Sequence, residues 1–394
     1  MAESRPNDDL MFSAEHEQFR LVVRRLVQER LDPFVDEWEA AGIFPAHEVF
    51  RQFGDVGALG LEYSPDVGGQ GADHSFTVVL AEELGRCDAG GPTTALAVQA
   101  AMATPALARF GSTELQQRFL VPAVAGSAVA AVAISEPDAG SDVAGIRTRA
   151  VPDGDSWVIT GRKLWITNGA QADWVCLLAR TSDDGGHRGM SLIIVPTDVP
   201  GFSVGRRIEK LGQHSSDSAE LVLDGVRVPM SHTVGEVGRG FSMQMAQFQD
   251  ERLFIAYMAA AAARRALDRT ADYLAQRVAF GEPLLANRYL QYSLAELVAE
   301  VDLLQGYLRH TAARYVAGRE VTREATIAKL KAGRLSRQVA DACLQFHGGM
   351  GYAEEMWTAR YLRDARATAI AGGADEVMLR VIAQLEGYER RLAG

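Results

Sequence analysis

Val132-Ala-Ile-Ser-Glu-Pro-Asp-Ala-Gly-Ser141-Asp142 is the stretch that decides the fold, together with Lys163-Leu-Trp165-Ile-Thr167-Asn168-Gly169. The first is an apolar strand that breaks at Pro137 into a turn, and the second is a short strand that ends at a strong tight-turn pair. The two motifs predict neighbouring loops at strand ends, rich in backbone N–H groups and hydroxyls. Such a surface can hydrogen-bond the polar edge of a planar heterocycle while the indole of Trp165 covers its apolar face.

The periodicity of the chain changes twice on either side of this region. Apolar residues recur at helical spacing up to about residue 125, short β runs separated by Gly, Pro and Asp follow, and long amphipathic helices with no convincing strand return from Gly240. Asp224-Gly225 reads as a hairpin turn. The pattern predicts a mainly α protein with a central β domain, divided into an N-terminal helical domain (1–125), a middle β domain (126–239) and a C-terminal helical bundle domain (240–394). It is not βαβ alternation, and no glycine-rich dinucleotide fingerprint opens a helix after a strand.

Composition excludes several classes of protein. A formal net charge of -11 argues against general nucleic-acid binding. Cys87, Cys176 and Cys343 stand in no metal spacing and fit a reducing compartment, so we expect no metal site. The N-terminus shows no signal peptide, and the apolar run from Leu253 to Ala263 is too short to cross a bilayer. We therefore expect a soluble, cytoplasmic protein that does not insert into membranes.

The order and spacing of further motifs resemble the acyl-CoA dehydrogenase family over nearly the whole chain. Each motif is weak alone, but together they make the resemblance specific. Besides the two opening motifs they are Pro200-Gly-Phe-Ser-Val204, Lys210-Leu-Gly212, Asp224-Gly-Val-Arg-Val-Pro229, Gln345-Phe-His-Gly-Gly-Met-Gly-Tyr352 and Arg363-Asp-Ala-Arg366. The resemblance implies an N-terminal helical domain, a middle β-barrel or sandwich-like domain and a C-terminal four-helix bundle. It also implies a homotetramer with one FAD per subunit, bound partly across a subunit interface.

By motif matching, the resemblance assigns FAD contacts to three groups of residues. Those near the isoalloxazine and ribityl chain are Val132, Ala133, Ile134, Ser135, Gly140, Ser141, Trp165, Ile166 and Thr167. Those toward the FAD of a neighbouring subunit are Arg277, Phe280, Gln345, His347, Gly348 and Gly349. A third group, at a predicted helix start, is Ala374, Asp375 and Glu376. Many relatives carry Gln where Arg288 stands, so contact there with the adenine half is open.

The catalytic base departs from the commonest family motif. The reaction removes an α-proton from an acyl thioester while hydride leaves the β-carbon, which requires a positioned carboxylate. Many relatives hold that Glu in a loop after the Arg-Asp-Ala-Arg motif. The matching stretch here is Ile370-Ala-Gly-Gly-Ala-Asp-Glu376, and the Glu position is Gly372. The commonest motif alone would therefore predict an inactive protein.

Glu251 is the alternative base. Phe248, Glu251, Ile255 and Met258 share one helix face, so a carboxylate interrupts an apolar stripe, where burial without a partner costs several kcal/mol. Long-chain and isovaleryl-CoA dehydrogenases place their base on this helix and have Gly or Ala in the loop. Gly372 would leave room for the carboxylate while its N–H binds the thioester oxygen. The bland alternative for Glu251 is a salt bridge to Arg252 or to an arginine of another helix.

Substrate contacts are expected at Ser141, Gln249, Arg252 and Gly373. The expected substrate is an acyl-CoA thioester, and the expected electron acceptor is an electron-transferring flavoprotein, although a direct oxidase stays open. Three alternatives also stay open: an acyl-carrier-protein thioester as substrate, a flavin oxidase or monooxygenase reaction on the same fold, and a non-catalytic binding protein. Acyl chain length and branching do not follow from the sequence.

Overall fold

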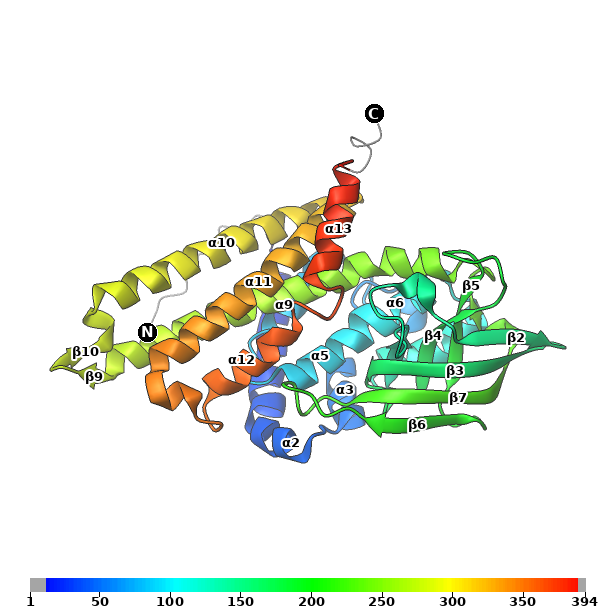
Figure 1. The fold of residues 1–394 in the computed structure, drawn as a ribbon, viewed down its shortest axis with the longest axis horizontal. Helices are drawn as coiled ribbons and strands as arrows, with labels where there is room; N and C mark the ends of the chain where they lie inside the picture. The colour runs from blue at the N-terminus through cyan, green and yellow to red at the C-terminus, as the bar shows by residue number, and fades with distance from the viewer. Residues whose placement is uncertain (1–11, 389–394) are drawn as a thin grey trace.

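The computed structural model describes residues 12–388, in which one β-sheet lies at one side of the molecule and two groups of helices pack beside it (Figure 1). The first group packs around apolar side chains such as Phe44, Phe50 and Phe53, which are fully buried. Its helices are α1 Ala14–Leu26, α2 Val35–Ala41, α3 Ala46–Gly54, α4 His74–Leu84, α5 Gly90–Val98, α6 Pro105–Phe110, α7 Thr113–Leu115 and α8 Val121–Val124. The glycine-rich stretch from Gly57 to Gly71 contains one short 3-10 turn, Pro65–Val67.

The middle of the chain forms an eight-stranded sheet in the order β6-β7-β3-β2-β4-β5-β8, with β1 parallel to β4. Its strands are β1 Ala130–Ala133, β2 Arg149–Asp153, β3 Ser156–Thr167, β4 Trp174–Arg180, β5 Met190–Pro196, β6 Phe202–Arg207, β7 Ser218–Pro229 and β8 Thr233–Val234. β4 and β5 are buried on both faces. Alternate side chains of each strand pack into the core shared with the helices and into a second core formed by strands of the sheet. This double burial explains their uninterrupted apolar runs.

The hairpin turn predicted at Asp224-Gly225 is wrong. β7 continues through these residues and pairs with β3 on both sides of them, with a register shift between Ile159 and Gly161. Gly225 has a φ of 65°, and it absorbs the extra residue as a bulge inside a long strand. A turn-forming pair therefore marks a kink of the strand here, and the chain does not reverse.

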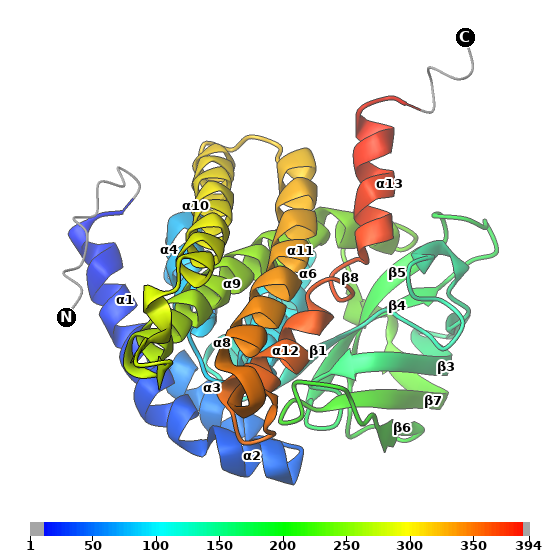
Figure 2. The same ribbon diagram turned by 60° about the vertical axis from the view of Figure 1, so that its left-hand side comes forward.

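Helices return after Gly240, as expected. α9 (Gly240–Gln276) contacts β5 near its start and then runs beside α10 (Arg288–Val316) and α11 (Thr322–His347) to the far end of the molecule (Figures 1 and 2). α12 (Trp357–Ala367) and α13 (Asp375–Leu385) pack against α11. The expectation of no strand in this part is wrong in one detail, because β9 (Val278–Ala279) and β10 (Glu282–Pro283) form a small hairpin between α9 and α10.

No helix within residues 12–388 has both the length and the apolar character that crossing a bilayer requires. α9 is the longest, with 37 residues, but arginines and aspartates interrupt its second half. Its buried side chains face α4, α10 and α11 instead.

Candidate active site

The structure brings the two opening motifs together, as the sequence predicts. The N–H of Leu164 on β3 donates to the carbonyl of Ser135 over 2.9 Å, which joins β3 to the loop after β1. Lys163 Nζ donates to the carbonyl of Ile134 (2.8 Å) and pairs with Glu136 (2.9 Å). Lys163 is fully buried, and burial lowers its pKa to about 8 against the opposing effect of Glu136. The two loops therefore form one hydrogen-bonded surface.

Trp165 is presented to solvent by an unusual backbone conformation. Its φ is 65°, in the left-handed region, and the β3–β7 register shifts between Lys163 and Ile166. The indole is 58% exposed, although Lys163 and Ile166 on either side of it are buried. An exposed indole on a strained residue is costly for folding alone, so the conformation points to a function for this ring.

The other predicted residues of this surface differ in exposure. Gly140 and Ser141 are exposed, and Val132, Ser135 and Thr167 are half-buried. Ala133 and Ile134 are buried, so a ligand would meet them mainly through their backbone.

Glu251 on α9 is the buried carboxylate that the apolar stripe predicts. It is 9% exposed, and residues 12–388 offer it no hydrogen bond or ion pair, so the salt bridge to Arg252 is absent. Burial raises the pKa of Glu251 to about 7, while the charges of Arg252 and Lys329 act in the opposite direction. A carboxyl group that titrates near neutral pH, with its oxygens free, can accept a proton from a bound molecule.

Gly372 faces Glu251 from the loop between α12 and α13. A Cβ built on Gly372 would lie 3.2 Å from Glu251 Oε1 and 2.6 Å from Ile255 Cδ1, so both side-chain ends would have to shift to admit one. The φ of 66° also favours glycine. The predicted common face of Glu251 and Ile255 is thereby confirmed. Within the described chain, no acceptor bonds to the N–H of Gly372. The loop thus places an unused donor beside an unused carboxylate.

Gly373, Gln249 and Arg252 lie around this pair. Gly373 has a φ of 101°, and its carbonyl accepts a hydrogen bond from Lys329 Nζ. Arg252 is buried, with Nη1 donating to Thr326 over 3.2 Å, and Gln249 is half-buried one turn away on α9. The neighbourhood of Glu251 therefore carries two buried cations.

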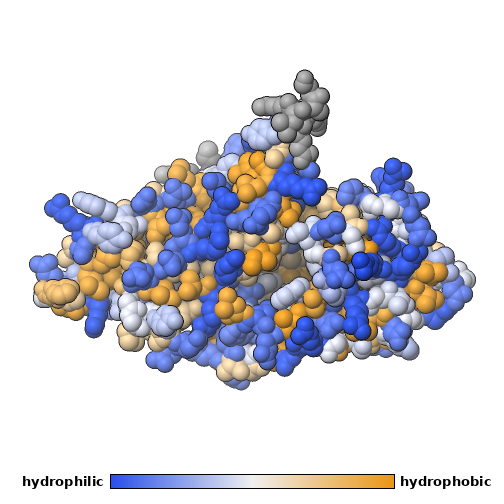
Figure 3. Space-filling model, in the orientation of Figure 1, coloured by the Kyte–Doolittle hydropathy of each residue, from blue (hydrophilic) through white to orange (hydrophobic). Residues whose placement is uncertain are grey.

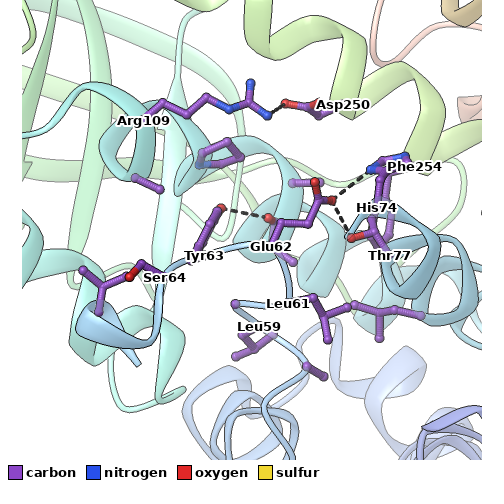
Figure 4. Close-up of a pocket in the computed structure, with 18 of the residues that line it drawn as sticks. Leu59, Leu61, Glu62, Tyr63, Ser64, His74, Thr77, Arg109, Asp250 and Phe254 are labelled. Atoms are coloured by element: carbon purple, nitrogen blue, oxygen red, sulfur yellow. Dashed lines mark hydrogen bonds and ion pairs between the residues drawn. The ribbon is translucent and has the colours of Figure 1, made fainter. Parts of the chain in front are cut away.

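Asp250, next to Glu251 in sequence, has a different environment. Arg109 pairs with it over 2.7 Å and the hydroxyl of Tyr315 donates to it over 2.6 Å, so its carboxylate is ion-paired. It lines a cavity of about 340 Å³ that also contains the His74–Glu62 pair (Figure 4). Glu251 and Gly372 do not line that cavity, and Arg109–Asp250 and His74–Glu62 are paired within it. The cavity is therefore separate from the Glu251–Gly372 site.

The residues expected at a neighbouring subunit's FAD lie far from Glu251. Arg277 follows α9, 26 residues beyond Glu251, which corresponds to about 39 Å along the helix. Phe280 is fully exposed, with a φ of 54°. Gln345, Gly348 and Gly349 are exposed at the end of α11. Within one chain this cluster does not reach the site.

His347 and Asp375 have structural partners. His347 is buried against Tyr273, and its Nδ1 lies 2.7 Å from the carbonyl of Cys343. Asp375, at the first position of α13, pairs with Arg334 and Arg337 over 3.3 and 3.4 Å. Ala374 is the N-cap and Glu376 is exposed in the first turn, as expected for a helix start.

Two buried lysines were missed by sequence reasoning. Lys163 lies in β3 close to Trp165. In a strand with one exposed face a lysine is ordinary, so the sequence pattern did not indicate that this one is buried. Lys329 lies on α11 in the series Ala325, Lys329, Ala332 and Ser336, all buried at helical spacing. The argument that found Glu251, a charge inside an apolar stripe, would also have found Lys329.

Three family models match the chain almost end to end. The N-terminal, middle and C-terminal domains of acyl-CoA dehydrogenase match residues 13–127, 131–226 and 238–385. The chain belongs to the acyl-CoA dehydrogenase family. It is therefore an oxidoreductase with the fold that the resemblance implied.

Individual acyl-CoA dehydrogenases agree with this assignment. The mitochondrial long-chain specific enzyme of Sus scrofa is 36% identical, over 95% of this chain and 87% of its own length. The crystal structure of an acyl-CoA dehydrogenase from Geobacillus kaustophilus has a TM-score of 0.92 at 35% identity, covering 95% of this chain and 98% of that one. A glutaryl-CoA dehydrogenase from Mycobacterium smegmatis, solved in complex with FADH2, has a TM-score of 0.90 at 30% identity and covers 97% of each chain. Acyl-CoA dehydrogenases are flavin-dependent, and this chain shares their fold throughout.

Proposed function

We propose that this protein is an FAD-dependent dehydrogenase that converts an acyl-CoA thioester to the trans-2-enoyl thioester, with Glu251 as the base. The observation that carries the proposal is the contact between Glu251 and Gly372. A buried carboxylate without a partner lies against a loop whose backbone N–H is also without one. Proton removal next to a thioester carbonyl requires such a base and such a donor together.

The residues of the sheet surface fit a flavin. The exposed indole of Trp165 offers a flat apolar cover, and the adjacent loops supply backbone groups and the hydroxyls of Ser135, Ser141 and Thr167. When bound, FAD would supply the acceptor for the hydride that leaves the substrate β-carbon. The chain's own contribution would be to hold the flavin ring against this surface and to exclude water from the ring face that Trp165 covers.

Glu251 would take the α-proton of the substrate. Its raised pKa places the carboxylate near the neutral pH at which a base is effective, and the free carboxylate oxygens need no bond to be broken first. Gly372 would bind the thioester oxygen through its N–H as negative charge develops there. Ser141, Gln249, Arg252 and Gly373 are proposed to contact the substrate around this centre.

The distant cluster at the end of the bundle supports a homotetramer. Arg277, Phe280, Gln345, Gly348 and Gly349 are exposed together in one chain, and a Cβ built on either of these two glycines would meet nothing within 4 Å. Apolar side chains are exposed among the polar ones on the face that Figure 3 shows. In the C-terminal helical part, Tyr289, Tyr292, Leu303, Met350 and Tyr352 are exposed. A second subunit would cover this surface, and the cluster of the first subunit would then contact the FAD bound by the second. Mass measurement in solution tests the assembly.

The first test is an anaerobic titration. The purified protein is mixed with acyl-CoAs of different length and branching, and the visible absorbance of the flavin is followed. Bleaching supports the dehydrogenase and ranks its substrates, with an electron-transferring flavoprotein then tested as acceptor. A yellow protein that no acyl-CoA bleaches would contradict the proposal and would point to another thioester or another reaction.

Glu251→Gln tests the base, with Asp250→Asn as the matched neighbour. Glutamine keeps the size of the side chain but cannot accept the proton, so flavin reduction should slow by about 10²- to 10⁴-fold while FAD stays bound. Asp250→Asn breaks a pair outside the site and should slow reduction far less. Near-normal reduction by Glu251→Gln would exclude Glu251 as the base.

A further inference from the structure

Lys329 is the most deeply buried charge near the proposed site that the mechanism above does not use. Its side chain on α11 is fully buried, and Nζ donates to the carbonyl of Gly373. That bond joins α11 to the loop that carries Gly372. Since the N–H of Gly372 lies one residue before that carbonyl, the position of the donor depends on this anchor.

The charges around Lys329 come from two other helices. α9 supplies Glu251 and Arg252, and the start of α13 supplies Asp375 and Glu376. Asp375 already pairs with Arg334 and Arg337, and Glu376 is exposed. Glu251 is the buried carboxylate of this group that has no ion pair of its own.

Burying an ammonium group costs several kcal/mol unless a charge or a hydrogen bond compensates it. Burial lowers the pKa of Lys329 to about 8, while Asp375 and Glu251 act to raise it. The cation also favours the charged form of Glu251. A fold that needed only a helix contact here could use an apolar side chain, as at the neighbouring Ala328 and Leu330.

We infer that Lys329 is a positioning residue for the reaction: it fixes the Gly372–Gly373 loop through the Gly373 carbonyl, and its charge favours the carboxylate form of Glu251. The inference rests on the proposed function, because it assigns Lys329 a role toward the proposed base. It predicts that the charge and the hydrogen bond have separable effects, the first on the pH at which the base works and the second on the rate.

The test compares Lys329→Met, Lys329→Gln and Lys329→Arg with Lys331→Met, an exposed control on the same helix. The rate of flavin reduction by the best acyl-CoA is measured from pH 5.5 to 9 in single turnovers. Met removes the charge and the donor, Gln removes the charge but keeps a donor, and Arg keeps both. Substrate affinity is measured alongside from the concentration dependence of the rate.

Loss of the cation should raise the midpoint of the acid limb by about one pH unit in the Met and Gln variants. At pH 6 these variants should then lose about tenfold more activity than at pH 8.5. Met should also slow the maximal rate more than Gln does, whereas Arg and Lys331→Met should keep the wild-type midpoint. If Lys329→Met does not fold, Gln against Arg still measures the charge.

An unchanged midpoint in Lys329→Gln, with activity lowered equally at every pH, would overturn the inference and leave Lys329 a structural residue. Failure of the proposed function is seen separately, because the wild-type flavin would then not be reduced by any acyl-CoA.

Discussion

Glu251 and Gly372 occupy complementary space: a Cβ on Gly372 would lie 3.2 Å from Glu251 Oε1. A side chain at this loop position would therefore press on the carboxylate from α9, which would have to shift by a few tenths of an ångström. If Glu251 is the base, as proposed, this close approach accounts for glycine at the loop position that carries the base in many relatives. The rigidity of α9, packed along α11, places the carboxylate more firmly than a loop would.

Gly372→Ala should destabilise the protein and impair its activity. The positive φ alone costs about 1 kcal/mol for alanine, and the shift that a Cβ would force on Ile255 Cδ1 and Glu251 Oε1 adds to it, so we expect about 1–2 kcal/mol. Gly185→Ala is the matched control, because Gly185 has the same φ of 66° and a Cβ there would meet nothing within 4 Å. Thermal unfolding and flavin reduction are measured for both. Equal losses of stability would show that the space beside Glu251 does not matter.

Glu251→Gln should stabilise the folded protein at alkaline pH. Folding raises the pKa of Glu251 from 4.5 to about 7, so the folded state holds the proton more tightly than the unfolded state. Stability contributed by this group is therefore lost as pH rises from about 4.5, and the full cost, at most about 3 kcal/mol, applies above pH 7. Glutamine cannot ionise and avoids that cost.

Unfolding temperatures of wild type and Glu251→Gln, both saturated with FAD, check this at pH 5 and pH 8.5. The variant should gain a few degrees at pH 8.5 and less at pH 5, whereas Glu37→Gln, an exposed carboxylate on α2, should change neither. A variant less stable than wild type at pH 8.5 would mean that the carboxylate has a stabilising partner.

The sequence predicts the helix–sheet–helix order and the burial of the Glu251 carboxylate because both depend on periodicity. A carboxylate at a buried helical position is visible without coordinates, as Glu251 shows. The hairpin at Asp224-Gly225 fails because the same dipeptide serves a turn or a bulge, and pairing with β3 decides between them. The roles of Lys163 and Lys329 depend on carbonyls of distant loops, which local patterns do not show.

Lys163→Met should destabilise the loop after β1. The pair with Glu136 is buried, and removing one partner leaves the other without its counter-charge, at a cost of about 3–5 kcal/mol. The carboxylate of Glu136 keeps bonds from the N–H groups of Arg147 and Thr148, so we expect the lower end of that range. Denaturation of the FAD-free protein measures the change in the free energy of unfolding. Arg162→Met is the control, because the Arg162 side chain is 67% exposed.

The double variant Lys163→Met/Glu136→Gln distinguishes the contribution of the Lys163–Glu136 ion pair from that of the hydrogen bond between Lys163 and the loop after β1. Because both charges are then removed, part of the lost stability should return, which gives a coupling energy of about 1–3 kcal/mol. Additive losses would mean that Lys163 acts mainly through its bond to the Ile134 carbonyl.

Trp165→Gly should weaken FAD binding without lowering the stability of the FAD-free protein. Glycine adopts a φ of 65° without strain, and the indole is 58% exposed, so its removal costs little packing. If the indole covers the flavin, its loss should reduce FAD affinity by at least about tenfold, since stacking on an aromatic ring contributes on the order of 1–3 kcal/mol per planar base. Val151→Gly on the exposed face of β2 is the control for a large-to-glycine change in the same sheet. FAD affinity is measured by fluorescence titration of the stripped protein. An affinity equal to that of wild type, with lowered stability, would make Trp165 a structural residue and remove the sheet surface from the proposed flavin site.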